Sequence, residues 1–158
     1  MQTTLRHSYS SLTPALLGCA YFVLAMLALG HSRFEGGLAF IWGANALLMA
    51  VLLTSRINDW PALLTAAGVA GAAAASLWGM GPLAAVPMAI INLAEALIVA
   101  LVCRRFAPGR KFAGSMRPLL IFTLALCGPA NMLAGVAAAW VASLLTPVSF
   151  GASWLQWY

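Results

Sequence analysis

The chain has 158 residues, of which 63% are hydrophobic and 7% are charged, and its formal net charge is +5. Soluble domains carry about 25% charged residues, and a small soluble domain buries only about two thirds of the surface that its unfolded chain exposes. This composition excludes a water-soluble fold. We therefore expect an all-α integral membrane protein, built as a polytopic bundle of transmembrane helices.

Crossing the hydrocarbon core takes a helix of about 20 mostly apolar residues. Five such segments are predicted, at 14–30, 38–55, 60–79, 83–103 and 118–145, and a sixth helix begins near Ser153 without room to cross. Gly128-Pro129 lies inside the fifth segment, where we expect a kink rather than a break because neither half could span alone. We interpret residues 1–158 as one domain that is incomplete at its C-terminus.

The basic residues predict the orientation, because Lys and Arg collect in cytoplasmic loops. Residues 104–117 carry five positive charges, and placing them inside gives seven basic residues inside against one outside. The N-terminus is then cytoplasmic, and the chain is a multi-pass protein of a bacterial cytoplasmic (inner) membrane. Anionic lipid of the inner leaflet, rather than nucleic acid, accounts for the net charge. Arg6 before the first segment leaves a cleaved signal peptide as the alternative interpretation of that segment.

Tryptophans are typical of the two membrane interfaces. We expect Trp42, Trp78 and Trp140 at the outer interface, together with Trp154 and Trp157, and Trp60 at the inner one.

Four polar residues are predicted to meet inside the bilayer. Glu95 is the only acid within a span, and Asn92 lies three residues before it on the same helix face. Asn45 of the second segment and Asn131 of the fifth fall at similar depths by their helical rise, with Asn45 about 10 Å below the outer surface and Glu95 one turn deeper than the asparagines. A carboxyl group at this depth must face the interior of the bundle. The cluster is either hydrogen-bond glue between helices or an outward-facing polar pocket that takes a small ligand or a proton.

Small residues recur every four positions in two segments and let helices approach closely. They are Ala67, Gly71, Ala75 and Gly79 in the third segment, and Gly135, Ala139 and Ser143 in the fifth. They serve either packing within the chain or a homodimer seam. No nucleophile motif, phosphate-binding loop or metal-ligand spacing is found, so we expect no catalytic residue, no metal and no cofactor in this chain.

The order of these signals resembles the first type of bacterial membrane-associated sensor domain, an integral membrane input module found ahead of diguanylate cyclases, phosphodiesterases and histidine kinases. The matching runs are Ile41-Trp42-Gly43-Ala44-Asn45-Ala46, the basic turn from Arg56 to Pro61, Asn92-Leu93-Ala94-Glu95-Ala96-Leu97, Arg104-Arg105-Phe106 and Trp154-Leu155-Gln156-Trp157-Tyr158. The chain departs from the family where Gly43 replaces a common Pro and Ile91 a usual Gly. Family domains are also longer, with about eight spans.

The resemblance implies a sensory input domain. It would detect a small ligand, a proton or a membrane signal through the polar cluster, and it would pass the signal to a cytoplasmic output domain that this sequence does not contain. The alternative is a small transporter or a membrane subunit of a larger complex. Beyond the lipid bilayer, the partners left open are a small-molecule ligand, a second copy of the chain and another membrane protein.

Overall fold

The computed structural model describes residues 12–31, 43–79, 81–107 and 116–155, and within these ranges every regular element is helical. This confirms the all-α prediction. The elements are α1 (Leu12–His31), α2 (Gly43–Thr54), η1 (Ile57–Asp59), α3 (Trp60–Trp78), α4 (Pro82–Phe106), α5 (Met116–Ala125), η2 (Leu126–Ala130), α6 (Asn131–Leu145) and α7 (Phe150–Leu155).

Four described helical segments are long and apolar enough to cross a membrane. They are residues 13–31, 57–78, 82–106 and 116–145. The remaining expected segment, 38–55, corresponds to α2, which has 12 residues and begins at Gly43, while residues 38–42 lie outside the described ranges. Four candidate spans and one shorter apolar helix therefore stand where five spans were expected.

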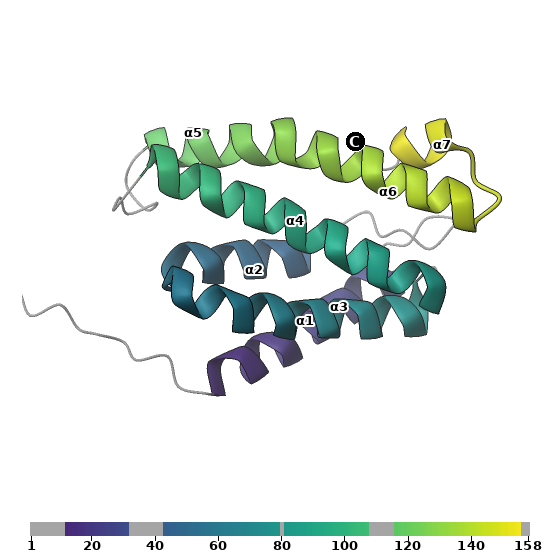
Figure 1. The fold of residues 1–158 in the computed structure, drawn as a ribbon, viewed down its shortest axis with the longest axis horizontal. Coiled ribbons are helices and arrows are strands. Elements are labelled where there is room, and N and C mark those ends of the chain that lie inside the picture. The colour runs from purple at the N-terminus through teal and green to yellow at the C-terminus, as the bar shows by residue number, and fades with distance from the viewer. Residues whose placement is uncertain (1–11, 32–42, 80, 108–115, 156–158) are drawn as a thin grey trace, which may run out of the picture.

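The helices run alongside one another, with α4 in the middle of the bundle (Figure 1). α5, η2 and α6 lie along one side of α4, and α1, α2 and α3 lie on the other. α4 is the most buried of the long helices. Its buried positions fall at 84, 85, 88, 89, 92, 95, 96, 99, 100 and 103, a stripe broader than the single face of a surface helix. α4 can therefore contact helices on both sides.

The small residues of α3 bring three helices close together. A Cβ at Gly71 would lie 3.2 Å from Cε1 of Tyr21 on α1 and 3.9 Å from Cβ of Ala89 on α4. A Cβ at Gly68 would lie 2.9 Å from Cδ1 of Leu93 on α4. This face of α3 is therefore used for packing within the chain, as small residues at helix interfaces allow.

The long apolar segment 116–145 is interrupted where Gly128-Pro129 predicts it. α5 passes into the π-helical segment η2, in which Gly128 has the non-helical angles φ −98° and ψ −114°. Pro129 has no N–H to give to the preceding turn, so the regular ladder cannot continue through it. α6 then begins at Asn131 and runs to Leu145. The segment is kinked and still continuous.

Candidate functional site

Asn45 and Glu95 meet in the middle of the bundle. The side-chain amide of Asn45 donates a hydrogen bond from Nδ2 to Oε2 of Glu95 at 2.7 Å, and the same nitrogen lies 3.3 Å from the backbone oxygen of Asn92. Asn45 is 4% exposed and Glu95 is 8% exposed. One amide therefore joins α2 to a side chain and to a main-chain carbonyl of α4.

Tyr21 extends this contact to a third helix. Its hydroxyl donates to Oδ1 of Asn45 at 2.8 Å, and the side chain is only 1% exposed. Sequence reasoning missed this residue. The available signal was a phenol on the face of α1 that also carries Leu17, Ala25 and Leu29, since a buried Tyr usually finds a hydrogen-bond partner for its hydroxyl. The polar cluster of Tyr21, Asn45 and Glu95 thus links α1, α2 and α4.

The depth expected for Asn45 below the outer surface stays a prediction, but the structure gives its level relative to α4. Placing it about 10 Å below the outer surface assumed a straight second span that began at residue 38. In the structure Asn45 is the third residue of α2 and reaches Glu95, which lies about 20 Å along α4 from Pro82. The cluster therefore lies near the middle of α4.

The other two predicted residues take different positions. The backbone oxygen of Asn92 belongs to the cluster, and its side chain is buried. Asn131 is half-buried at the first residue of α6, directly after η2. The hydrogen bonds of the cluster described above run through α1, α2 and α4, so the inclusion of Asn131 stays a prediction.

Within the part of the chain that the structure describes, no cation is bonded to the polar cluster, and its chemistry follows from this. Among the described residues, the polar atom bonded to the carboxyl group of Glu95 is an amide nitrogen, and the nearest arginine along α4, Arg104, is bonded elsewhere. An ionised carboxylate held at this depth without a cation costs several kcal/mol. A carboxyl group can gain or lose a proton, or accept a hydrogen bond from a ligand. Either event would change the hydrogen bond between Asn45 and Glu95.

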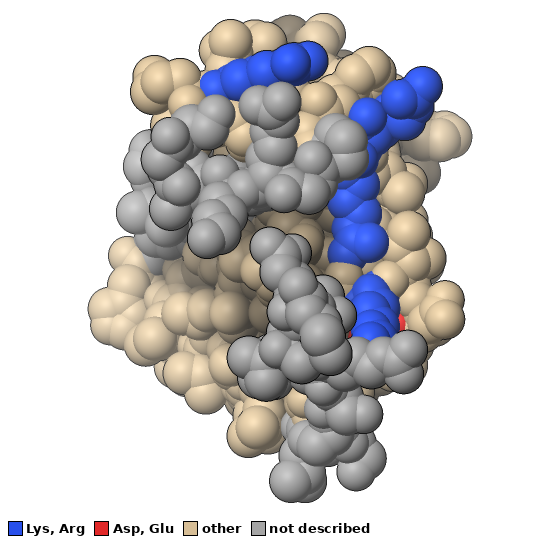
Figure 2. Space-filling view, turned by 90° about the vertical axis from the view of Figure 1, so that its left-hand side faces the viewer, with Lys and Arg blue, Asp and Glu red and all other residues tan. Residues whose placement is uncertain are grey.

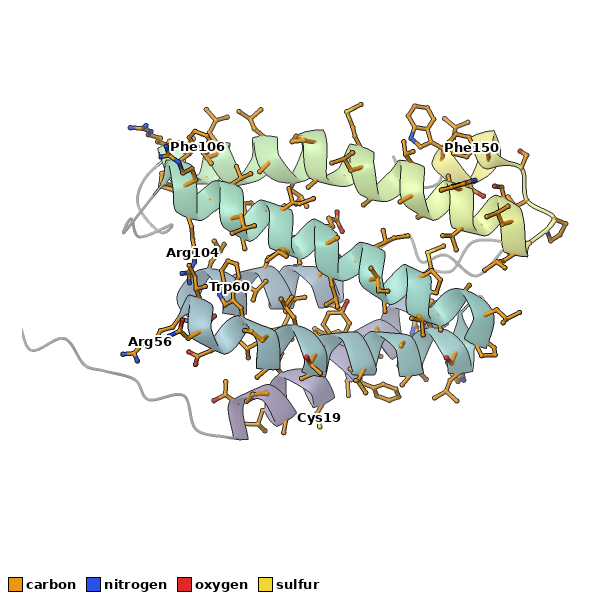
Figure 3. The ribbon with its side chains drawn as sticks, in the orientation of Figure 1. Cys19, Arg56, Trp60, Arg104, Phe106 and Phe150 are labelled. Carbon is orange, nitrogen blue, oxygen red and sulfur yellow. The ribbon has the colours of Figure 1, made fainter. Side chains whose placement is uncertain are left out.

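A second polar cluster closes the α2–α3 turn. The guanidinium of Arg104 donates from Nη2 to the backbone oxygens of Leu52, at 3.0 Å, and of Ser55. Its Cζ lies 4.7 Å from the centroid of the Trp60 ring, and the indole N–H of Trp60 donates to the same Leu52 oxygen at 3.2 Å. Figure 3 shows Arg104 and Trp60 together at this end of the bundle. The last carbonyls of a helix have no partner within it, so Arg104 completes the C-terminus of α2.

Trp60 is only 4% exposed and packs under Arg104, so its ring is covered by the protein. Its position at the inner interface stays a prediction. Trp78 and Trp140, by contrast, expose 53% and 65% of their side chains, and Trp42 lies outside the described residues.

A pocket of about 310 Å³ lies at the far end of α1 and α3. It is lined by Leu29, Gly30, Leu77 and Trp78, none of which belongs to the polar cluster. Its lining side chains are apolar apart from that of Trp78. Within the described ranges, no group of three His, Cys, Asp or Glu side chains could hold a metal ion.

Comparisons with known proteins identify no relative: no protein-family model, no curated protein and no solved structure matches this chain.

Proposed function

We propose that this chain is the integral membrane input domain of a bacterial signal-transduction protein, and that the polar cluster is its sensing element. The observation that carries the proposal is the contact of Glu95 with Asn45, which itself accepts from Tyr21. An acid inside a span is a functional hypothesis by default, because it costs stability that apolar packing would not. The signal would be a proton or a small hydrogen-bonding ligand.

The hydrogen bonds suggest how such a signal would act. Asn45 uses its amide nitrogen toward α4 and its carbonyl oxygen toward α1, so both sides of the amide are engaged. Protonation of the Glu95 carboxylate, or a ligand that competes for it, would weaken the hydrogen bond from Asn45 to Glu95. The hold of α2 on α4 would then be weaker. A signal moves a protein between two arrangements only if it binds them unequally. The kinked segment 116–145 is the natural moving part, since its ladder is already interrupted at Gly128.

The proposed topology has five crossings and a cytoplasmic N-terminus. Its support is that the α2–α3 turn, with Arg56, and the end of α4, with Arg104, lie at the same end of the bundle (Figure 3). Antiparallel neighbours joined by short connections produce this arrangement. In this topology α2 counts as a crossing despite its 12 helical residues. Reporter enzymes fused after residue 107 and after residue 146 should report opposite sides of the membrane.

The test uses a cysteine that the chain already places in the kink. Cys127 lies in η2 and is exposed, Cys103 is buried, and Cys19→Ser removes the other exposed thiol. A spin label on Cys127 of the chain in lipid nanodiscs should change mobility across a proton titration. Glu95→Gln, which keeps the shape and loses the titrating group, should abolish that change.

Ser76→Ala is the matched control, because within the described ranges the hydroxyl of Ser76 donates to the Ala72 oxygen of its own helix. It should leave the titration curve in place. Identical curves for Glu95→Gln and the parent chain, or no change with pH in either, would return Glu95 to a packing role. Solute flux into liposomes that contain the purified chain would favour the transporter instead.

A further inference from the structure

One end of the bundle carries exposed arginines. Arg56 follows α2, Arg105 lies in the last turn of α4, and Arg117 lies in the first turn of α5; all three side chains are exposed. Figure 2 looks at this end and shows basic side chains gathered along one part of it. Arg104 differs from these three because its guanidinium is bonded inside the bundle.

Among the described residues, no acidic side chain forms an ion pair with these arginines. The chain has three acids, of which Glu95 lies in the polar cluster and Glu35 falls in the sequence between α1 and α2. The third, Asp59, lies at this end, but its Oδ2 is buried without a hydrogen-bond partner among the described residues. The exposed arginines therefore keep their N–H donors available for an anion from outside the chain.

Exposed apolar residues are next in sequence to two of these arginines. Phe106 directly follows Arg105 and is 58% exposed, and Met116 directly precedes Arg117 and is 80% exposed. Leu119 and Leu120 continue the exposed apolar surface along α5. A guanidinium beside exposed apolar surface matches a molecule that has a phosphate at one end and hydrocarbon at the other.

We propose that the junction of α4 and α5 binds an anionic phospholipid. Arg105 and Arg117 hold its phosphate through paired N–H donors, which suit phosphate oxygens better than the point charge of a lysine. Phe106, Met116 and the leucines of α5 contact its acyl chains. Arg105 also lies over the Phe106 ring, with Cζ 5.7 Å from the centroid. The ring supports the guanidinium and leaves its N–H donors for the phosphate. This site is independent of the polar cluster around Glu95.

The test measures thermal unfolding of the detergent-purified chain with added phosphatidylglycerol, phosphatidylcholine or inorganic phosphate. Phosphatidylglycerol should raise the midpoint in a concentration-dependent way, because a ligand that binds only the folded state stabilises it. Phosphatidylcholine and inorganic phosphate should leave it unchanged. Each of Arg105→Gln and Arg117→Gln should weaken the apparent affinity for phosphatidylglycerol by about fivefold, in line with the electrostatic contribution of one arginine near an anionic surface.

Arg33→Gln is the control, since it also removes one positive charge but from the sequence between α1 and α2. It should keep the parent affinity. Arg105→Lys with Arg117→Lys retains the charge and tests the paired donors, so it should fall between the parent and the glutamine variants. Equal stabilisation by inorganic phosphate, an equal loss in Arg33→Gln, or no stabilisation by phosphatidylglycerol would overturn the proposal.

Discussion

The two polar clusters of this protein both join α2 to α4, and they do so with different chemistry. Near the middle of α4 the contact uses neutral groups, the amide of Asn45 and the hydroxyl of Tyr21, with the carboxyl group of Glu95. At the end of α4 the contact uses a cation, Arg104, on main-chain oxygens of α2. A guanidinium near the end of a helix can reach the membrane interface, where water still solvates its charge. A charged group at the midplane has no such access to water. The end cluster is therefore suited to holding the helices together, and in the proposed function the central cluster is the part that responds to the signal.

Removing the cation at the end should give the largest effect on stability. Arg104→Met keeps the length of the side chain but removes the donors to Leu52 and Ser55 and uncovers the Trp60 ring. Each hydrogen bond to a charged group contributes about 1.5–3 kcal/mol, so we expect the free energy of unfolding to fall by about 3 kcal/mol. Equilibrium unfolding in mixed micelles of mild detergent and dodecyl sulfate measures this change.

Arg105→Met is the matched comparison on the neighbouring residue. Arg105 is exposed, and its contact among the described residues is the Phe106 ring, so its loss should change the free energy of unfolding by less than about 0.5 kcal/mol. Equal losses in the two variants would show that the charge at this end, rather than the bonds to α2, stabilises the fold.

The sequence predicted the helical class, the kink and the central acid because each depends on local chemistry. Apolar length indicates a span, Gly128-Pro129 indicates an interruption, and an acid in a span must face inward. The bond between Asn45 and Glu95 also follows the prediction that their side chains would turn toward one centre.

What the sequence could not supply was the register between helices. Arg104 was counted only as an inside charge and Trp60 only as an interfacial ring, although the two stack on each other and share the Leu52 oxygen. That contact depends on the register of α2 against α4, and the local sequence of neither helix predicts this register. Tyr21 was missed for the same reason, since its partner is 24 residues away on another helix.

Breaking the central cluster at its hub should give an intermediate effect. Asn45→Ala removes the donor to Glu95 and the acceptor for Tyr21 at once, so two buried polar groups each lose a hydrogen bond. Hydrogen bonds between membrane helices average about 0.6 kcal/mol and reach about 1.7, so we expect a loss of about 2 kcal/mol in the free energy of unfolding.

Tyr21→Phe removes only one of these bonds and should lose less than half as much. A double-mutant cycle of the two substitutions isolates their coupling. Additive losses would mean that the hydroxyl of Tyr21 and the amide of Asn45 do not interact in the membrane.

A substitution at Gly71 should change stability less than Asn45→Ala does, and it tests the central cluster without removing any of its polar atoms. Gly71→Ala places a methyl group 3.2 Å from Cε1 of Tyr21, so the ring must shift. Alanine favours a helix over glycine by about 1 kcal/mol, which offsets much of the crowding, and the net change in unfolding free energy should stay within about 1 kcal/mol. The coupling between Tyr21 and Asn45 should nevertheless fall, because a shifted ring moves the hydroxyl away from Oδ1. Gly43→Ala, whose Cβ would meet nothing within 4 Å, should leave that coupling intact. An unchanged coupling in Gly71→Ala would mean that α1 can adjust around α3, and that the position of Tyr21 is set by its hydrogen bond rather than by the packing beneath its ring.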